Sequence, residues 1–298
     1  MRKHVLVLYY SQTGQLTDIV NQFLEPFYAL ELSVEVIQIK PLQDFPFPWT
    51  SASFFDAMPE TVLGHPIPLQ DFEFKRERYD LVVLAYQPWF LSLSLPINAL
   101  VRLGKVQAVL NDTPVVTLIG SRNMWISSQE KLKALLQTAG AKLVGNIALV
   151  DRNPNLISVV TILYWMLTGK KDKYMGLFPK PGVSDEDIAQ TRIFGQTTLD
   201  FLFTEKWDDL QQQLVRQGAV AVQYNLMFIE ERAPRLFSLW ARFIIKRQNR
   251  KAWLVVFKYY LLFALFIVAP IVLTLNTLFL RVLFLKKAAA KMKYYQGL

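Results

Sequence analysis

Four branched apolar residues stand side by side at positions 5–8, and this run restricts the possible folds more than any other feature of the chain. A strand with one wet face alternates apolar and polar residues, whereas an unbroken apolar run suits a parallel strand that is covered on both faces. After a polar turn at residues 11–15, apolar side chains recur three or four positions apart from residue 16 to residue 24, as one helix face requires. The sequence therefore predicts a central parallel strand, a turn and a helix.

The same alternation of strand and helix continues through the first half of the chain. Further strands are predicted at residues 33–39, 79–85, 114–119 and 142–150, and helices at residues 95–110 and 127–139. Five strands joined by crossover helices indicate an α/β fold with an open, doubly wound parallel sheet. In such sheets the ligand lies beyond the carboxyl ends of the strands.

The turn at residues 11–15 is a candidate phosphate site. It stands at the N-terminus of the predicted helix, where unpaired N–H groups and the positive end of the helix dipole attract an anion. A plain polar loop is the alternative, because neither the G-x-G-x-x-G nor the P-loop pattern is present. The candidate binding residues are Ser11, Gln12, Thr13, Gly14, Gln15 and Leu16.

Two further predicted strands end in segments that could contact the same ligand, because the carboxyl ends of parallel strands lie at one edge of the sheet. Aromatic residues after the third and the fourth strand can cover a flat ring, and packing beneath a neighbouring loop is the alternative interpretation. The candidate binding residues here are Pro88, Trp89, Phe90, Gly120, Ser121 and Trp125, and the candidate catalytic residues, chosen only by their location, are Tyr86, Arg122 and Asn123.

Composition disfavours several kinds of chemistry. The 298 residues include no Cys and only two His, His4 and His65, so a thiolate nucleophile, a Cys-ligated metal and a Ser-His site are disfavoured, and no metal site is predicted. His65 is predicted to be a loop residue. The apolar run near Met1 is shorter than the roughly 7 to 15 residues of a secretory signal, so we expect the α/β domain in the cytosol.

Basic charge is concentrated at the end of the chain. Residues 232–298 contain 13 Lys and Arg and no acidic residue, which leaves 20 basic and 24 acidic residues in positions 1–231. Because this end is also the most apolar part of the sequence, a membrane surface explains it better than nucleic acid does. The predicted organisation is an α/β domain at 1–150, a helical extension at 151–231 and a basic, hydrophobic, membrane-associated region at 232–298.

Residues 261–280 carry no charge in 20 positions. As a helix this segment would be about 30 Å long, the thickness of the hydrocarbon core of a membrane, and a buried hairpin is the alternative. A single crossing would translocate the basic end that follows, against the positive-inside rule. We therefore predict that both flanks stay on the cytoplasmic face of the inner membrane and that the segment is re-entrant or lies in the interface, with a single span as the alternative.

Residues 40–78 interrupt the strand and helix alternation with a long segment that is rich in Pro and aromatic side chains. Long loops in compact domains usually serve a function. This insertion is predicted to be a lid or a substrate-contacting flap, and a packed structural arm is the alternative.

The segments at residues 11–15, 88–90 and 120–123 together resemble those of flavodoxin-like FMN proteins, over about half of the chain. Ser11, Thr13 and Gly14 match the phosphate-binding pattern of that family, whereas Leu16 stands where the family usually has Thr or Ser. More narrowly, the segment LYYSQTGQLT, followed by such a domain and a hydrophobic extension, resembles the bacterial dialkylresorcinol condensing enzymes.

This narrower resemblance implies a function. In these pathways a ketosynthase joins two acyl chains into a cyclic dione, and the flavodoxin-like partner is thought to oxidise the dione to an aromatic resorcinol. The resemblance thus implies FMN as cofactor, a hydrophobic dialkylcyclohexanedione as substrate, membrane lipid as surroundings and a ketosynthase as a possible partner.

Three other functions use the same sequence features. A membrane-associated NAD(P)H:quinone reductase would need the same flavin site and the same anchor. A non-enzymatic scaffold that recruits a ketosynthase would have lost flavin, and the departure at Leu16 leaves this open. A one-electron carrier ranks third, behind the dione oxidase and the quinone reductase, because such carriers are usually small and strongly acidic, whereas this α/β domain is only mildly acidic.

Overall fold

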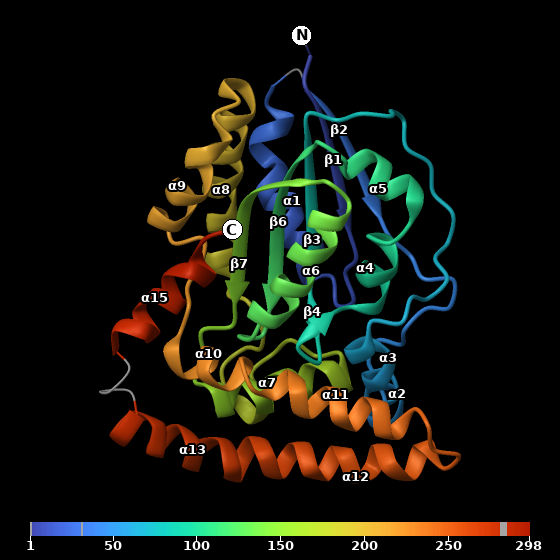
Figure 1. Ribbon diagram of the computed structural model, residues 1–298, viewed down its shortest axis with the longest axis vertical. Helices are drawn as coiled ribbons and strands as arrows, with labels where there is room; N and C mark the ends of the chain where they lie inside the picture. The colour runs from blue at the N-terminus through green and yellow to red at the C-terminus, as the bar shows by residue number, and fades with distance from the viewer. Residues whose placement is uncertain (1, 31, 281–284) are drawn as a thin grey trace.

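The computed structural model describes residues 2–30, 32–280 and 285–298. Its centre is a parallel five-stranded sheet in the order β2-β1-β3-β6-β7 (Figure 1). The strands are β1 (His4–Tyr9), β2 (Ser33–Gln38), β3 (Leu81–Tyr86), β6 (Pro114–Ser121) and β7 (Lys142–Val150). This is the strand order of the flavodoxin-like fold, so the predicted α/β class is confirmed.

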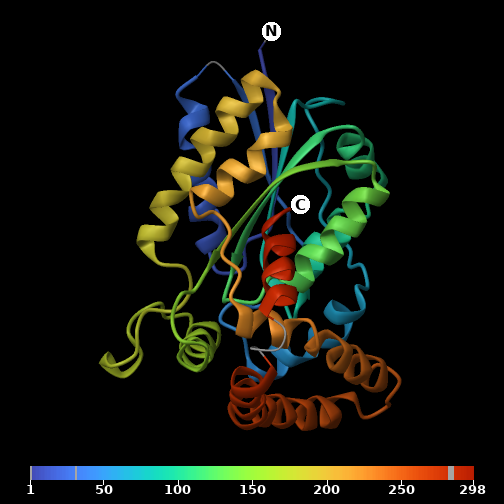
Figure 2. The same cartoon turned by 60° about the vertical axis from the view of Figure 1, so that its left-hand side comes forward.

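Strand β1 is central, as the apolar run at residues 5–8 predicts. It pairs with β2 on one side and β3 on the other, and all four residues of the run have no exposed surface. Helices cover both faces of the sheet (Figure 2). One face carries α1 (Gln15–Tyr28), α8 (Asp185–Thr204) and α9 (Leu210–Arg216), and the other carries α4 (Leu95–Leu100), α5 (Gly104–Leu110) and α6 (Ile126–Thr138).

The helix predicted at residues 95–110 is two helices. The chain leaves the helical conformation after α4, Leu103 is extended, and α5 begins at Gly104. The insertion at residues 40–78 is also more ordered than a loop, because it contains α2 (Ser51–Asp56) and α3 (Met58–Leu63). Thr50 and Ser53 form a capping box at the start of α2, which explains why a helix begins there.

Helical segments occupy the end of the molecule at which the strands terminate. These are α7 (Asn155–Thr168), the 3₁₀ turn η1 (Tyr174–Gly176), α10 (Tyr224–Glu230), α11 (Ala233–Ile244) and α15 (Leu285–Gln296). The two residues that form the turn between β4 (Pro88–Trp89) and β5 (Ser92–Leu93) also lie at this end. The 3₁₀ turn η2 (Trp207–Asp209) precedes α9 at the opposite end, where Glu205 pairs with Lys3 beside the start of β1.

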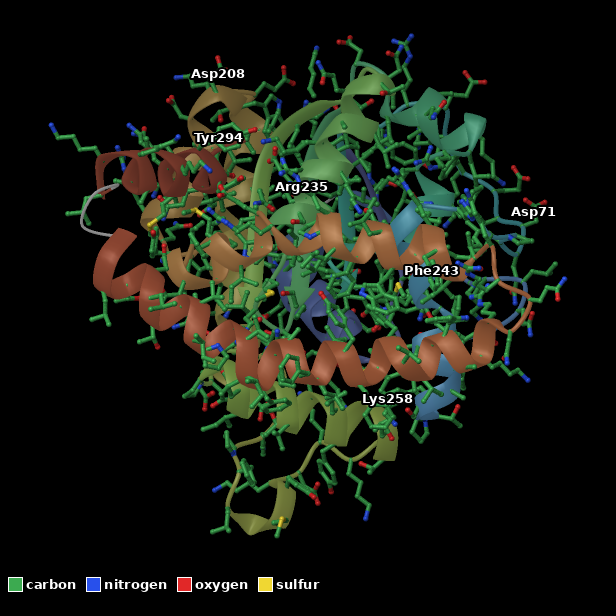
Figure 3. The ribbon with its side chains drawn as sticks, turned by 60° about the horizontal axis from the view of Figure 1, so that its bottom comes forward. Asp71, Asp208, Arg235, Phe243, Lys258 and Tyr294 are labelled. Atoms are coloured by element: carbon green, nitrogen blue, oxygen red, sulfur yellow. The ribbon has the colours of Figure 1, made fainter. Side chains whose placement is uncertain are left out.

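A long apolar helix crosses this end of the molecule, at right angles to the strands (Figure 1). It consists of α12 (Arg250–Phe263), the π-helical turn η3 (Ala264–Val268), α13 (Ala269–Leu275) and the π-helical turn η4 (Asn276–Leu280). Figure 3 shows it beside α11, which carries Arg235 and Phe243. Within the described residues, Arg250–Leu278 is the one helix long and apolar enough to cross a membrane, with a mean hydropathy of 2.4 and 6% of its most apolar window buried.

Both ends of the long helix are attached to the rest of the molecule. At its start, Arg250 Nη1 and Nη2 lie 2.5 and 2.6 Å from the two carboxylate oxygens of Glu60, on α3. Near its end, Asn276 is buried and lies 3.3 Å from the hydroxyl of Tyr224, on α10. Some 26 residues separate these two attachments, so about 39 Å of helix lies along the surface of the domain.

The chain returns to the α/β domain after the long helix. In α15, Lys291 Nζ lies 2.7 Å from Glu231 Oε1, and the Tyr294 hydroxyl donates to Glu130 Oε2 at 2.9 Å. Residues 281–284, which belong to the basic flank considered above, lie outside the described residues. The described part of the final segment therefore packs against α6 and the end of α10.

Candidate functional site

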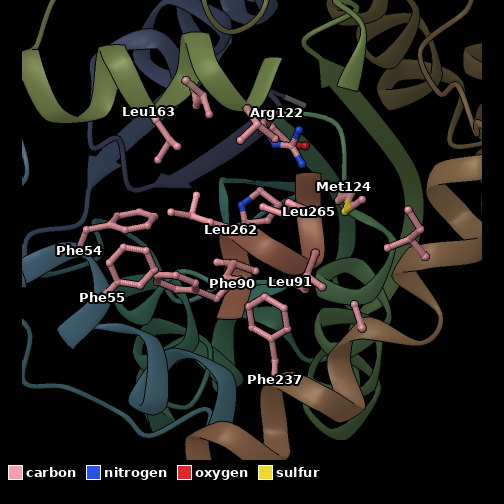
Figure 4. A pocket seen from close by; sticks show the side chains of 17 residues that line it. Phe54, Phe55, Phe90, Leu91, Arg122, Met124, Leu163, Phe237, Leu262 and Leu265 are labelled. Atoms are coloured by element: carbon pink, nitrogen blue, oxygen red, sulfur yellow. The ribbon is translucent and has the colours of Figure 1, made fainter. Parts of the chain in front are cut away.

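Two adjoining cavities lie at the carboxyl ends of the strands. The first, called the strand-end cavity, has a volume of about 220 Å³. Its lining residues are Gln12, Thr13, Gln15, Phe54, Gln87, Pro88, Trp89, Phe90, Gly120, Ser121, Arg122, Ile162, Leu163, Trp165, Met166 and Gly182. The second, called the helix-covered cavity, measures 230 Å³ and lies beneath the long helix (Figure 4). Seven residues line both cavities: Phe54, Pro88, Phe90, Ser121, Arg122, Ile162 and Leu163.

The turn at residues 11–15 forms one wall of the strand-end cavity. Gly14 is the N-cap of α1 and has a φ of 87°, a left-handed conformation that favours glycine. A Cβ atom built on Gly14 would meet no protein atom within 4 Å. The backbone conformation, and not protein crowding, therefore accounts for glycine at this position.

Two hydroxyl groups near this wall are buried without a partner. The Oγ atoms of Ser11 and Ser121 make no hydrogen bond, and Ser121 lines both cavities. An unsatisfied buried polar group costs about 1–3 kcal/mol, so its presence calls for an explanation. A bound anion at the N-terminus of α1 would accept from such hydroxyls, which fits a phosphate group at this turn.

Three other residues of the turn have structural contacts. Gln12 donates through Nε2 to the carbonyl oxygens of Phe45 and Pro46, at 3.2 and 3.0 Å. Gln15 makes two hydrogen bonds with the backbone of Val183, at 3.0 and 3.1 Å. Gln12 and Gln15 line the strand-end cavity, whereas Leu16 is buried in the core and does not line it. This corrects the expectation for the Leu16 side chain, because it faces the core.

The aromatic loop after β3 is a tight hairpin with a strained turn. Phe90 and Leu91 have φ values of 47° and 58°, and two consecutive positive φ values are the geometry of a type I′ turn, which usually contains Asn and Gly. Holding a non-glycine residue in this region costs roughly 1–3 kcal/mol. The turn places Phe90 at the boundary between the two cavities, where its ring centroid lies 4.9 Å from that of Phe54.

Trp89 lines the strand-end cavity and also packs against the insertion, and its contact with a bound ring stays a prediction. Its side chain lines the strand-end cavity, yet it is only 9% exposed. Its ring makes edge contacts with Phe45 and Trp49 of the insertion, at centroid distances of 5.0 and 5.5 Å. The insertion therefore supports the aromatic wall of the cavity, and through Phe54 it also contacts the cavity directly.

Within the part of the chain that the structure describes, Arg122 is the one charged side chain that lines the two cavities. It is half-buried, and its Nη1 donates to the carbonyl and to the Oδ1 of Asn155, at 3.2 and 2.8 Å. Burial lowers the pKa of Arg122 to about 10, and the negative charges of Asp151 and Glu230 partly oppose this effect. The guanidinium therefore stays charged at neutral pH, at the junction of the two cavities.

Three other predicted residues are buried outside both cavities. Tyr86 has no exposed surface, its hydroxyl donates to Gln129 Oε1 at 2.8 Å, and burial raises its pKa. Asn123 donates to Asn155 Oδ1 at 2.9 Å, and Trp125 is 3% exposed in the core. Tyr86 and Asn123 were predicted to be catalytic and Trp125 to bind the ligand, but none of the three side chains lines either cavity. Adjacent residues of a strand or turn point to different sides, and these three point away from the cavities. They support the rim from behind and do not contact its ligand space.

The sequence analysis missed Glu230 and the roof of the helix-covered cavity. Glu230 is buried, its Oε1 accepts from the Ser127 N–H at 3.0 Å, and its Oε2 has no partner. Burial raises the pKa of Glu230 to about 7. The roof comes from the long helix, through Leu261, Leu262 and Leu265. The sequence signal for Glu230 was an acidic residue in the apolar stretch at 226–230. No local pattern indicated that the long helix would cover a cavity.

Comparisons with known proteins find similar folds at low identity. No protein-family model matches the chain, and no curated protein matches it. A flavoprotein in complex with FMN from Lactobacillus acidophilus is 16% identical, with 49% of this chain and 93% of that chain covered and a TM-score of 0.41. An archaeal flavodoxin is 10% identical, with 67% and 99% covered and a TM-score of 0.37. A flavone reductase is 11% identical, with 67% and 63% covered and a TM-score of 0.35.

The fold assignment rests on the molecule itself. The strand order, the turn at the end of the central strand and the cavity beside it are the features of a flavodoxin-like fold.

Proposed function

We propose that this protein is an FMN-dependent oxidoreductase, held at the cytoplasmic face of the inner membrane, that oxidises a hydrophobic dialkylcyclohexanedione to a dialkylresorcinol. One observation carries the proposal. The strand-end cavity, with unsatisfied hydroxyls near its phosphate turn, adjoins an apolar cavity roofed by a helix that is long and apolar enough for a membrane.

The residues around the strand-end cavity fit FMN. Ser11, Thr13 and the N–H groups at the start of α1 would hold the phosphate, and Trp89 and Phe90 would border the ring. FMN is proposed over FAD because no second nucleotide-binding half accompanies the sheet in the described residues. When bound, FMN supplies a two-electron acceptor, and the protein supplies position and electrostatics.

Arg122 has the position and charge to orient the substrate. Oxidation of a cyclohexane-1,3-dione to a resorcinol removes two electrons and two protons. The dione is already acidic as its enol, so a cation at the junction of the cavities favours the ionised form and holds its oxygen. A strong general base is therefore unnecessary, and the burial of Tyr86 does not count against the reaction.

The far face of the long helix supports membrane association. Val255, Tyr259 and Phe263 are 53%, 63% and 58% exposed, and the basic residues that flank them suit anionic lipid. Attachments at Glu60 and Tyr224 support a helix that lies in the interface, with both flanks on the cytoplasmic side. A ketosynthase of the same pathway is the proposed protein partner, because it would make the dione.

The absorption spectrum of the purified protein, in detergent, tests this proposal first. A flavin band is expected, and its absence would favour the scaffold. A synthetic dialkylcyclohexane-1,3-dione added without air should then bleach the band, and the resorcinol should appear on mass spectrometry. If the dione leaves the flavin oxidised while NAD(P)H bleaches the band and a quinone restores it, the quinone reductase replaces our proposal.

A further inference from the structure

We propose that the helix-covered cavity binds one alkyl chain of the substrate, which enters from the lipid layer beside the long helix. This inference rests on the proposed function and adds to it a binding site for a specific part of the substrate. Its ligand class is an amphiphile with a polar ring and an unbranched aliphatic chain.

The chemistry of the cavity wall divides into a polar end and an apolar body. Among the described residues that line it, only Ser121 and Arg122 are polar, and both also line the strand-end cavity. The rest of the wall is aromatic or aliphatic, as Figure 4 shows for Phe55, Phe237 and Leu262. A molecule with its ring at the junction and its chain beneath the long helix matches both parts of this wall.

The roof of the cavity separates it from the exposed face of the same helix. Leu261, Leu262 and Leu265 line the cavity, whereas Phe263 and Ile267 are 58% and 50% exposed. The roof is thus one helix thick, with the cavity on one side and the face proposed to contact lipid on the other. A π-helical turn begins at Ala264 within the roof, and such turns are frequent at functional sites.

The floor of the cavity is formed by a left-handed backbone turn and by tilted and edge-to-face ring contacts. Phe90 keeps its left-handed conformation at the boundary, and Phe54 and Phe55 of the insertion extend the aromatic wall toward α12, where Phe55 lies 6.2 Å from Phe257 between ring centroids. Strained residues persist where the surrounding structure over-determines them, and they cluster at ligand sites. The insertion therefore contacts the chain as well as the ring, which is the flap interpretation of residues 40–78.

Photo-crosslinking locates the chain without relying on catalysis. The protein in lipid nanodiscs is irradiated with a pentadecylresorcinol that carries a diazirine at the end of its chain, and labelled peptides are identified by mass spectrometry. Labels are expected in α11 and at the roof of the cavity. Labels confined to the exposed residues of the long helix, such as Phe263, would show partition into lipid only and would overturn the proposal.

A matched pair of variants tests the same site by affinity. Leu262→Trp fills the cavity, whereas Leu278→Trp makes the same change at a 64% exposed position of the same helix. Alkylresorcinols of increasing chain length are then used to compete with the photoprobe. In the wild type and in Leu278→Trp, each added methylene should lower the competitor concentration that halves the labelling by up to about four-fold, equivalent to about 0.8 kcal/mol. Leu262→Trp should lose this dependence.

Two outcomes would contradict the proposal while leaving the function standing. These are equal chain-length dependence in both variants, and oxidation of diones with no preference for chain length. If Leu262→Trp does not fold, Leu265→Ala replaces it and should shift the preference to longer chains, and no shift would count against the proposal. Chain binding in a protein that holds no flavin would instead refute the proposed function and keep this site.

Discussion

We expect Glu230 to make the stability of the protein depend on pH. Its carboxyl group is 1% exposed, it accepts from the N–H of Ser127 at the start of α6, and one of its oxygens has no partner. Burial raises its pKa from 4.5 to about 7, because the charged form loses more by leaving water than it regains from these donors and from Arg122. The perturbation that tests this is Glu230→Gln, which keeps the shape and the acceptor and cannot ionise.

The magnitude follows from the two pKa values. A group with a raised pKa in the folded state contributes stability that is fully present below its unfolded value and is lost as the pH rises through its folded value. The window is therefore pH 4.5 to about 7. A difference of about 2.5 between the pKa values is equivalent to about 3 kcal/mol. As the pH rises through the window, the free energy of unfolding of the wild type should therefore fall by roughly this much relative to that of Glu230→Gln.

Urea unfolding in detergent, followed by tryptophan fluorescence below and above this window, measures the effect. Glu77→Gln is the matched control, because it makes the same change at an exposed carboxylate and should keep the pH dependence of the wild type. The reasoning would be refuted by a Glu230→Gln variant that loses as much stability as the wild type between the two conditions.

The remaining predictions concern the cofactor and the membrane. Thr13→Ala combined with Gly14→Val should abolish flavin retention on gel filtration, because it removes a hydroxyl and forces a Cβ into a left-handed position; undiminished FMN binding would sink the cofactor assignment. Arg242→Gln and Lys246→Gln should each weaken cosedimentation with anionic vesicles by up to about five-fold, equivalent to about 1 kcal/mol, and unchanged binding would argue against an electrostatic contact. A reporter fused after Leu298 should read as cytoplasmic, and a periplasmic signal would refute the interfacial arrangement.

Local sequence patterns were sufficient to predict the strands of the sheet and the apolar end of the chain. The apolar run at residues 5–8 predicted the central strand, and β7 begins and ends at the residues predicted for it, Lys142 and Val150. The start of α8 is likewise a local feature, because the side chain of its N-cap Ser184 accepts from the N–H of Asp187. These features depend on the few residues next to them, so a local pattern is sufficient to predict them.

The direction of side chains at the rim was decided only by the tertiary structure. Arg122 lines both cavities, while the adjacent Asn123 bonds to Asn155 behind them, and Tyr86 bonds to Gln129 within the core. The sequence placed all three rim residues at the correct edge of the sheet. It could not say which of them faces the ligand, because the turn conformation and the helices packed behind it decide that.

The site as a whole also depends on contacts between distant parts of the chain. Phe54 in the insertion, Arg122 after β6 and Leu262 in the long helix line one cavity, and Arg250 reaches Glu60 across 190 positions. Each segment has a local pattern that predicts its own conformation, but the pattern carries no information about which other segment it meets. Burial of the shared apolar surface, together with the charge pair at Glu60, selects that partner, and this selection takes place only when the whole chain folds.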